Sequence, residues 1–137
     1  YTATINEIIN TLEVAQPYDS LSEFVVQLKE AVKCLELTTQ EVLTAMSTKN
    51  IDLALANSVK YLELFGHVII AWLWLKQGIV ATRALAEHPH IEDEHFYQGK
   101  LHTLQYFYRF ELTKIAVWST ILTSTDPTSF EMKAEWF

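Results

Sequence analysis

The amino-acid sequence predicts an all-α protein, an up-and-down bundle of about four helices. Half of the 137 residues are hydrophobic and 20% are charged, which is the composition of a folded domain. Three glycines and three prolines are far fewer than a protein of many short strands and tight turns would use. Apolar residues recur every three or four positions over long stretches, which is the period of a helix with one buried face.

Two helices are expected before residue 48. The first ends near Gln16-Pro17, because proline lacks an amide donor and disfavours helix before it. The second begins at Ser20-Leu21-Ser22-Glu23, which has the form of a capping box. Their apolar series are Ile5, Ile8, Ile9 and Leu12, followed by Leu21, Phe24, Val25, Leu28, Val32, Leu35, Val42 and Met46.

A long third helix is expected between Thr48-Lys49-Asn50 and His88-Pro89, with Asn50 as its N-cap. From Leu62 to Leu75, apolar residues point in every direction around the helix axis. A helix of this kind must be covered on all sides, and one layer of neighbours in a small bundle would not suffice.

The fourth helix is expected to begin near His90 or Ile91, because the acidic run Glu92-Asp93-Glu94 suits the positive end of a helix dipole. It ends at Thr123-Ser124-Thr125-Asp126-Pro127. Its buried face is predicted from the series Tyr97, Leu101, Leu104, Tyr108, Glu111, Ile115, Trp118 and Leu122. We therefore expect one helical domain over residues 1–125 and a polar tail over residues 126–137.

Charge and composition exclude several classes of protein. A net charge of -7 argues against nucleic acid as a partner, since binding phosphates requires clustered Lys and Arg. The uncharged apolar run Leu64 to Leu75 is shorter than the roughly 20 residues of a membrane span, so no transmembrane segment is expected. The chain begins with Tyr1 and has no signal-peptide pattern, and we expect a fragment of a cytoplasmic protein.

Metal-binding residues are candidates for a helical bundle with five histidines. A di-metal carboxylate site needs two Glu-x-x-His motifs and two further glutamates on facing helices. Glu92-Asp93-Glu94-His95 has that spacing but lies at a helix start, and Glu63 and His67 form a single pair. The connection from Glu87 to His95 lacks the ligand order of structural zinc sites. We assign no metal ligand.

Catalytic residues are not predicted either. Cys34 lies within a helical pattern, and no nucleophile-elbow or phosphate-loop motif occurs. Gly66, Gly78 and Gly99 are isolated in helical patterns, where glycine usually allows close helix packing. Arg109 is expected to stack on rings or to pair with an acidic group such as Glu63, as a structural contact.

Three sequence blocks carry a resemblance to a known family. They are Tyr61-Leu62-Glu63-Leu64-Phe65-Gly66-His67-Val68 with Ala71-Trp72-Leu73-Trp74, then Phe96-Tyr97-Gln98-Gly99-Lys100, then Tyr106-Phe107-Tyr108-Arg109-Phe110-Glu111-Leu112. Together they resemble the C-terminal helical domain of large bacterial acyl-CoA dehydrogenases, the group that includes the 3-methylmercaptopropionyl-CoA dehydrogenases. The resemblance covers most of the chain and is strongest over the third and fourth helices.

The resemblance implies a parent flavoenzyme that binds FAD and oxidises an acyl-CoA thioester between its α and β carbons. In that family the catalytic glutamate and the flavin contacts lie in regions that precede this domain, so no residue of this chain inherits a catalytic role. The expected function is therefore assembly, through packing on the remainder of the parent enzyme or on another subunit of a homo-oligomer. The alternatives are a stand-alone helical interaction module and a metal-binding helical bundle.

Overall fold

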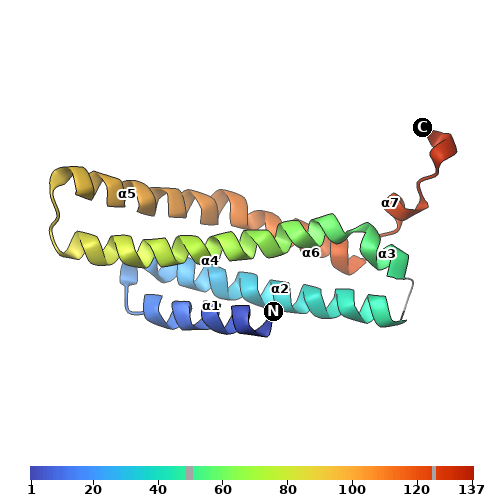
Figure 1. Cartoon of the computed structure of the whole chain (residues 1–137), viewed down its shortest axis with the longest axis horizontal. Helices are drawn as coiled ribbons and strands as arrows, with labels where there is room; N and C mark the ends of the chain where they lie inside the picture. Colours follow the sequence, from blue (N-terminus) through green and yellow to red (C-terminus); the bar gives the residue numbers. More distant parts are fainter. Residues whose placement is uncertain (49–50, 125) are drawn as a thin grey trace.

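The computed structural model describes residues 1–48, 51–124 and 126–137, without the side chains of residues 48, 53 and 54. Four long helical segments run alternately up and down, and no strand occurs among the described residues (Figure 1). The predicted all-α bundle is confirmed. The long segments are α1 (Thr2–Ala15), α2 (Ser22–Thr48), α4 (Ser58–Ala86), and α5 (Ile91–Tyr106) continued by α6 (Ile115–Ser124).

The start of α2 differs from the predicted capping box. A 3-10 turn, η1 (Asp19–Leu21), precedes α2, and the Ser22 hydroxyl donates to the Asp19 carbonyl at 2.8 Å. The Glu23 carboxylate does not turn back to the helix start, because it accepts two hydrogen bonds from Arg109. A bidentate guanidinium is a stronger partner for a carboxylate than one backbone amide, so the prediction of a capping box is wrong.

The predicted third helix is two helices. α3 (Ile51–Ala56) is followed by a break at Asn57, and α4 begins at Ser58. The Asn57 side chain donates to the carbonyl of Asp126 at 3.3 Å, and asparagine readily leaves helical geometry for such contacts. The predicted end near His88-Pro89 is confirmed, since α4 ends at Ala86 and His88 has a φ of 50°. The predicted N-cap Asn50 lies outside the described residues.

The fourth segment begins at Ile91, as predicted, but it is not a continuous α-helix. Between α5 and α6 lie a π-helical turn, η2 (Phe107–Glu111), and a 3-10 turn, η3 (Leu112–Lys114). The Leu112 amide donates to the Phe107 carbonyl five residues back. The wider turn advances each residue less around the axis, so Leu112 takes the buried place below Tyr108. Glu111, which we placed in the buried series, lies half-buried at its edge.

The core lies where α4 meets its neighbours α1, α2, α5 and α6. Leu64, Val68, Ala71 and Leu75 of α4 are fully buried there. At Gly78 a β-carbon would lie 2.5 Å from Leu104 Cδ1, so this glycine allows α5 to approach α4 closely. The apolar side of α2 is buried as predicted from Leu21 to Leu35, whereas Val42 and Met46 are half-buried.

Length and composition alone would allow α4 to cross a membrane. Core helices of soluble proteins pass the same test, and the buried face of α4 packs against four other helices. Absence of a transmembrane segment therefore stays a prediction. The tail carries two short elements, α7 (Thr128–Glu131) beside α3 and η4 (Ala134–Trp136), and none of their residues is buried.

Candidate functional site

His67 lies in a polar cluster where α4 meets the π-helical turn. Its Nε2 is 3.5 Å from Glu111 Oε2. Its ring lies near those of Trp118 and Phe107, with centroid distances of 4.6 and 5.7 Å. Lys114 Nζ donates to the same Glu111 carboxylate at 2.7 Å. The hydrogen bond from Lys114 is the main cause that lowers the pKa of Glu111 below its ordinary value, and the hydrogen bond from His67 lowers it further. The cluster fastens α4 to the irregular part of the fourth segment.

The predicted pair Glu63 and His67 does not form a ligand pair. The Glu63 carboxylate is bonded to Lys60 at 3.0 Å, and it is the Glu63 backbone carbonyl that lies 3.1 Å from His67 Nδ1. Glu92, Asp93 and His95 are exposed on the first turn of α5. In the part of the chain that the structure describes, no three His, Cys, Asp or Glu side chains come together as metal ligands. The geometry gives the metal-binding alternative no support.

Arg109 pairs with Glu23, not with Glu63. Its Nε and Nη2 donate to the two carboxylate oxygens of Glu23 at 3.0 and 2.9 Å, which ties η2 to the first turn of α2. The hydrogen bonds from Arg109 lower the pKa of Glu23. The expectation of a structural ion pair is confirmed, but its partner was wrong. Glu23 is 86 residues away in sequence, and no local pattern points to it.

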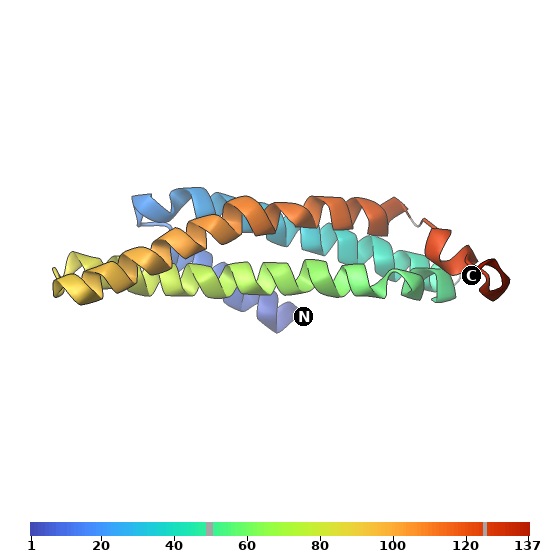
Figure 2. The same ribbon diagram turned by 90° about the horizontal axis from the view of Figure 1, so that it is seen from above.

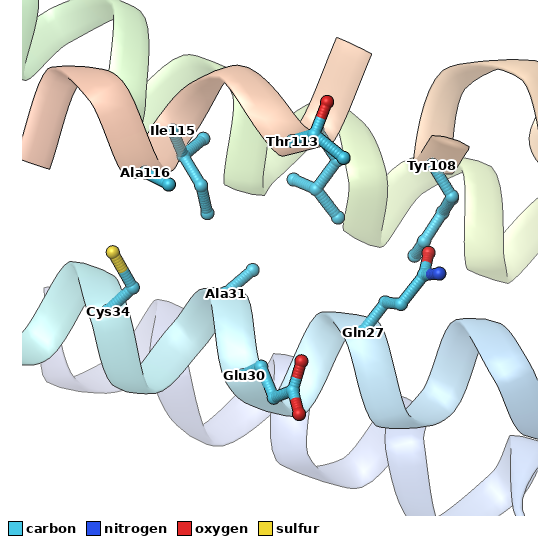
Figure 3. A pocket seen from close by; sticks show the side chains of 9 residues that line it. Gln27, Glu30, Ala31, Cys34, Tyr108, Thr113, Ile115 and Ala116 are labelled. Atoms are coloured by element: carbon cyan, nitrogen blue, oxygen red, sulfur yellow. The ribbon is translucent and has the colours of Figure 1, made fainter. Parts of the chain in front are cut away.

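A cavity of about 440 Å³ lies between α2 and the segment from η2 to α6 (Figure 3). Gln27, Tyr108 and Cys34 line it, and Glu30 points its carboxylate away from it. The Gln27 Oε1 atom is buried without a hydrogen-bond partner, whereas its amide nitrogen donates to Glu23 at 3.4 Å. The lining is mostly apolar and contains no histidine, so it offers Cys34 no general base.

Two apolar surfaces remain on the outside of the bundle. We call the first the α4 stripe; it consists of the exposed Val59, Leu62, Ile70, Leu73 and Val80 with the half-buried Gly66, and the exposed Gln77 interrupts it between Leu73 and Val80. The second, the α5–α6 surface, consists of Tyr106, Phe110 and Val117. Tyr106 and Phe110 stack with ring centroids 5.0 Å apart and an interplanar angle of 18°. Contiguous exposed apolar patches of this kind mark interaction surfaces.

As expected from the sequence, the neighbours within this chain do not cover α4 on all sides. Leu62 is 68% exposed and Val80 is 60% exposed, although both belong to a helix whose opposite face is fully buried. The four helices that pack on one side of α4 do not also reach its other side. The described residues therefore offer surfaces for binding and no evident chemical group for catalysis.

These features define an all-helical bundle domain that presents apolar surfaces to its surroundings. A protein-family model described as "Acetyl-CoA dehydrogenase C-terminal like" matches residues 2–133. The chain therefore belongs to this family of acyl-CoA dehydrogenase C-terminal domains, and the resemblance seen in the sequence blocks is confirmed at that level. No curated protein and no solved structure matches the chain.

Family membership implies that the parent enzyme binds FAD, and we compared this requirement with the residues present. A dinucleotide needs donors for its pyrophosphate, usually a glycine-rich turn, a helix start or Arg and Lys. The cavity of Figure 3 has Gln27 and Thr113 in its lining, the Glu30 carboxylate points away from it, and neither Arg nor Lys belongs to the lining. It does not fit the phosphates of FAD, and we assign no described residue to flavin binding.

Proposed function

We propose that this chain is an accessory assembly domain of an FAD-dependent acyl-CoA dehydrogenase of the cytoplasm. The family match over residues 2–133 supports the parent enzyme. We place that parent near the bacterial 3-methylmercaptopropionyl-CoA dehydrogenases because of the three sequence blocks. The reaction, α,β-dehydrogenation of an acyl-CoA thioester, belongs to other parts of the parent.

One observation carries the assembly role: the stacked pair Tyr106 and Phe110 is exposed on a well-packed domain. Phe110 is 63% exposed, although the π-helical turn that presents it is anchored by Arg109 and by the buried Tyr108. Rigid, exposed aromatic side chains dominate the energetics of protein interfaces. We propose that this α5–α6 surface packs against the catalytic body of the parent enzyme.

The first test is the reading frame that encodes Tyr1 and the sequence before it. We expect several hundred residues of flavoenzyme sequence, and the intact product should show flavin absorbance and reduce a dye with acyl-CoA. Purified residues 1–137 should show neither. Turnover by the isolated chain, or an unrelated domain upstream, would contradict the proposal; the unrelated domain would favour a stand-alone interaction module.

The second test places Phe110→Ser in the intact enzyme. We expect faster thermal inactivation and release of this domain from the catalytic body by limited proteolysis, because the substitution removes an interface anchor. The matched control is Val26→Ser on the exposed side of α2, where the side chain is 55% exposed. Equal behaviour of the two variants would show that the α5–α6 surface does not face the body.

A further inference from the structure

We propose that the groove between α4 and α5 is a binding site for a small, soluble organic phosphate. The groove has a volume of about 380 Å³ and is lined by Lys76, Val80 and Ala81 of α4 and by Phe96, Tyr97 and Lys100 of α5. Ligand pockets of proteins begin at about 300 Å³. The groove is separate from the α5–α6 surface, and the inference does not depend on the assembly role proposed above.

The two ends of the groove differ in charge. α5 runs back along α4 from the turn that joins them, so the two helices are antiparallel (Figure 2). On α4, Lys76 comes one helical turn before Val80, and on α5, Lys100 comes one helical turn after Phe96. Because the helices are antiparallel, both lysines lie at the end of the groove that is farther from the turn. A ligand that fits this groove therefore has a charged head and an apolar body.

The two lysine side chains are already held in place by aromatic rings. The Nζ atom of Lys100 lies 5.6 Å from the ring centroid of Trp74 on α4 and 5.4 Å from that of Phe96. The Nζ atom of Lys76 lies 5.1 Å from the ring centroid of Trp72. These cation–π contacts restrict both side chains before a ligand arrives, so less conformational entropy is lost on binding. Each ammonium group has three N–H donors, and donors remain for the oxygens of an anion.

Neither lysine is neutralised by an acidic side chain in the described part of the chain. Lys76 and Lys100 form no ion pair there, whereas two other lysines pair with glutamates. Although the net charge of the chain is -7, α4 carries no Asp or Glu within residues 64–86 and α5 carries none within residues 95–106. The nearest acidic residue on either helix is Glu94, about 9 Å along the axis from Lys100. Surface charges are largely screened beyond about 8 Å at physiological salt, so this end of the groove is locally positive.

Charge and length together favour an organic phosphate. A phosphate monoester carries a charge of about -1.5 to -2 at pH 7 and three acceptor oxygens, which match two ammonium groups better than a single carboxylate does. The lining of the groove extends on α4 from Lys76 to Ala81, about 8 Å along the axis. This length accommodates a phosphate and one ring system, whereas a dinucleotide such as FAD is longer. The phosphate lies between Lys76 and Lys100, and the apolar body lies against Val80 and Phe96.

The main test is a titration of isotope-labelled residues 1–137 with 1-naphthyl phosphate, followed by NMR. We expect saturable shifts of the backbone amides from Lys76 to Ala81 and from Phe96 to Lys100. The dissociation constant should be at least tenfold lower than for inorganic phosphate, which lacks the ring, and than for 1-naphthol, which lacks the charge. 1-Naphthoate, with a single charge, should also bind more weakly. Equal affinity for any of these three molecules would overturn the proposal, as would shifts confined to other parts of the chain.

Lysine variants test the charged head. Lys100→Gln and Lys76→Gln should each raise the dissociation constant of 1-naphthyl phosphate at least tenfold, because each removes one charge from the phosphate site. The matched control is Lys133→Gln, since Lys133 Nζ also lies over a ring, 5.2 Å from the centroid of Trp136, but outside the groove. This control changes the net charge equally and should leave the affinity within twofold. Lys100→Arg keeps the charge and should retain most of the binding, and circular dichroism checks that every variant is folded.

Vesicles that contain phosphatidic acid, a lipid with a phosphate monoester head, distinguish a lipid ligand from a soluble one. An anionic membrane repels a protein with net charge -7, so the chain should stay in the supernatant when such vesicles are sedimented. Sedimentation with the vesicles in place of binding to the soluble probe would overturn the proposal, as would the absence of saturable shifts at millimolar 1-naphthyl phosphate. Neither outcome touches the parent-enzyme and assembly proposals, which are read from flavin absorbance and from Phe110→Ser.

Discussion

Tyr108 is the most deeply buried aromatic side chain of the described residues, and its hydroxyl has a single partner. It donates to the Ala71 carbonyl at 2.6 Å, and the ring meets Phe24 edge-on at 5.2 Å. Burial raises the pKa of this phenol well above its ordinary value. One residue thus joins η2, α4 and α2, and the polar end of the ring sets their relative position.

We expect Tyr108→Phe to lower the free energy of unfolding by about 1 to 2 kcal/mol, because it removes a buried hydrogen bond while it keeps the ring. Urea denaturation at neutral pH measures this loss. The control is Tyr106→Phe, since that side chain is 54% exposed, and its effect should stay within about 0.5 kcal/mol. Equal effects of the two substitutions would contradict the role of the Tyr108 hydroxyl.

The natural protein and Tyr108→Phe should also differ in how their stability depends on pH. The pKa of Tyr108 is higher in the folded state than in the unfolded state, where tyrosine titrates near pH 10. The contribution of the Tyr108 phenol to the free energy of unfolding is complete below about pH 10 and is lost as the pH rises further. The stability difference between the natural protein and Tyr108→Phe should therefore shrink above pH 10.

At the scale of single residues, the sequence predicted which residues are buried better than it predicted which residues contact each other. The burial of Leu104 and Tyr108 followed from helical spacing, because the apolar face of a helix must be covered. The partner of Arg109 did not follow, since α2 and η2 meet through the bundle and not along the chain. The pair Glu111 and Lys114 was within reach, because side chains three residues apart share a helix face.

Among the helical elements, the fit of α4 against α5 depends on Gly78. A β-carbon there would lie 2.5 Å from Leu104 Cδ1 and 3.4 Å from Leu21 Cδ2, and both leucines are fully buried, so Leu104 would have to shift within the packed core. The three isolated glycines therefore differ: Gly78 allows close packing within the chain, as predicted, whereas Gly66 and Gly99 do not serve this purpose inside the bundle.

We expect Gly78→Ala to destabilise the protein by up to about 2 kcal/mol. Overpacking costs about 1 to 3 kcal/mol, and the gain in helix propensity offsets about 1 kcal/mol of that cost. Gly99→Ala gains the same propensity without a clash and should raise the melting temperature. A higher melting temperature for both variants would show that Leu104 can yield.

The existence of each long helix was predictable, and the interruptions were not. Hydrophobic periodicity and helix-end signals depend only on residues in and next to the helix, so they predicted the helix ends near Gln16 and His88. At the break, the Asn57 side chain donates to a carbonyl of the distant Asp126, and the π-helical turn packs against α4. No local pattern contains these tertiary contacts.

On the scale of the whole molecule, the division into a bundle and a tail remains a prediction. None of the residues of α7 or η4 is buried, and the exposed Asn57 to Asp126 hydrogen bond links the tail to the break before α4. Deleting residues 126–137 should therefore change the free energy of unfolding by less than about 1 kcal/mol.

Thermal unfolding followed by circular dichroism measures this change and its cooperativity. The shortened chain should still unfold in one sharp transition, since every residue of the buried hydrophobic core cluster lies before residue 126. A broad transition, or a loss of several kcal/mol, would mean that the tail belongs to the cooperative unit.

The paired turns η2 and η3 have a consequence for the angular phase of the fourth segment. A π turn underwinds the backbone and a 3-10 turn overwinds it, so the two rotations oppose each other. The buried face of α6 therefore continues the buried face of α5. Leu104 of α5 and Ile115 and Leu122 of α6 are all buried. Between the two helices, the π-helical turn presents Phe110 outward, where its side chain is 63% exposed.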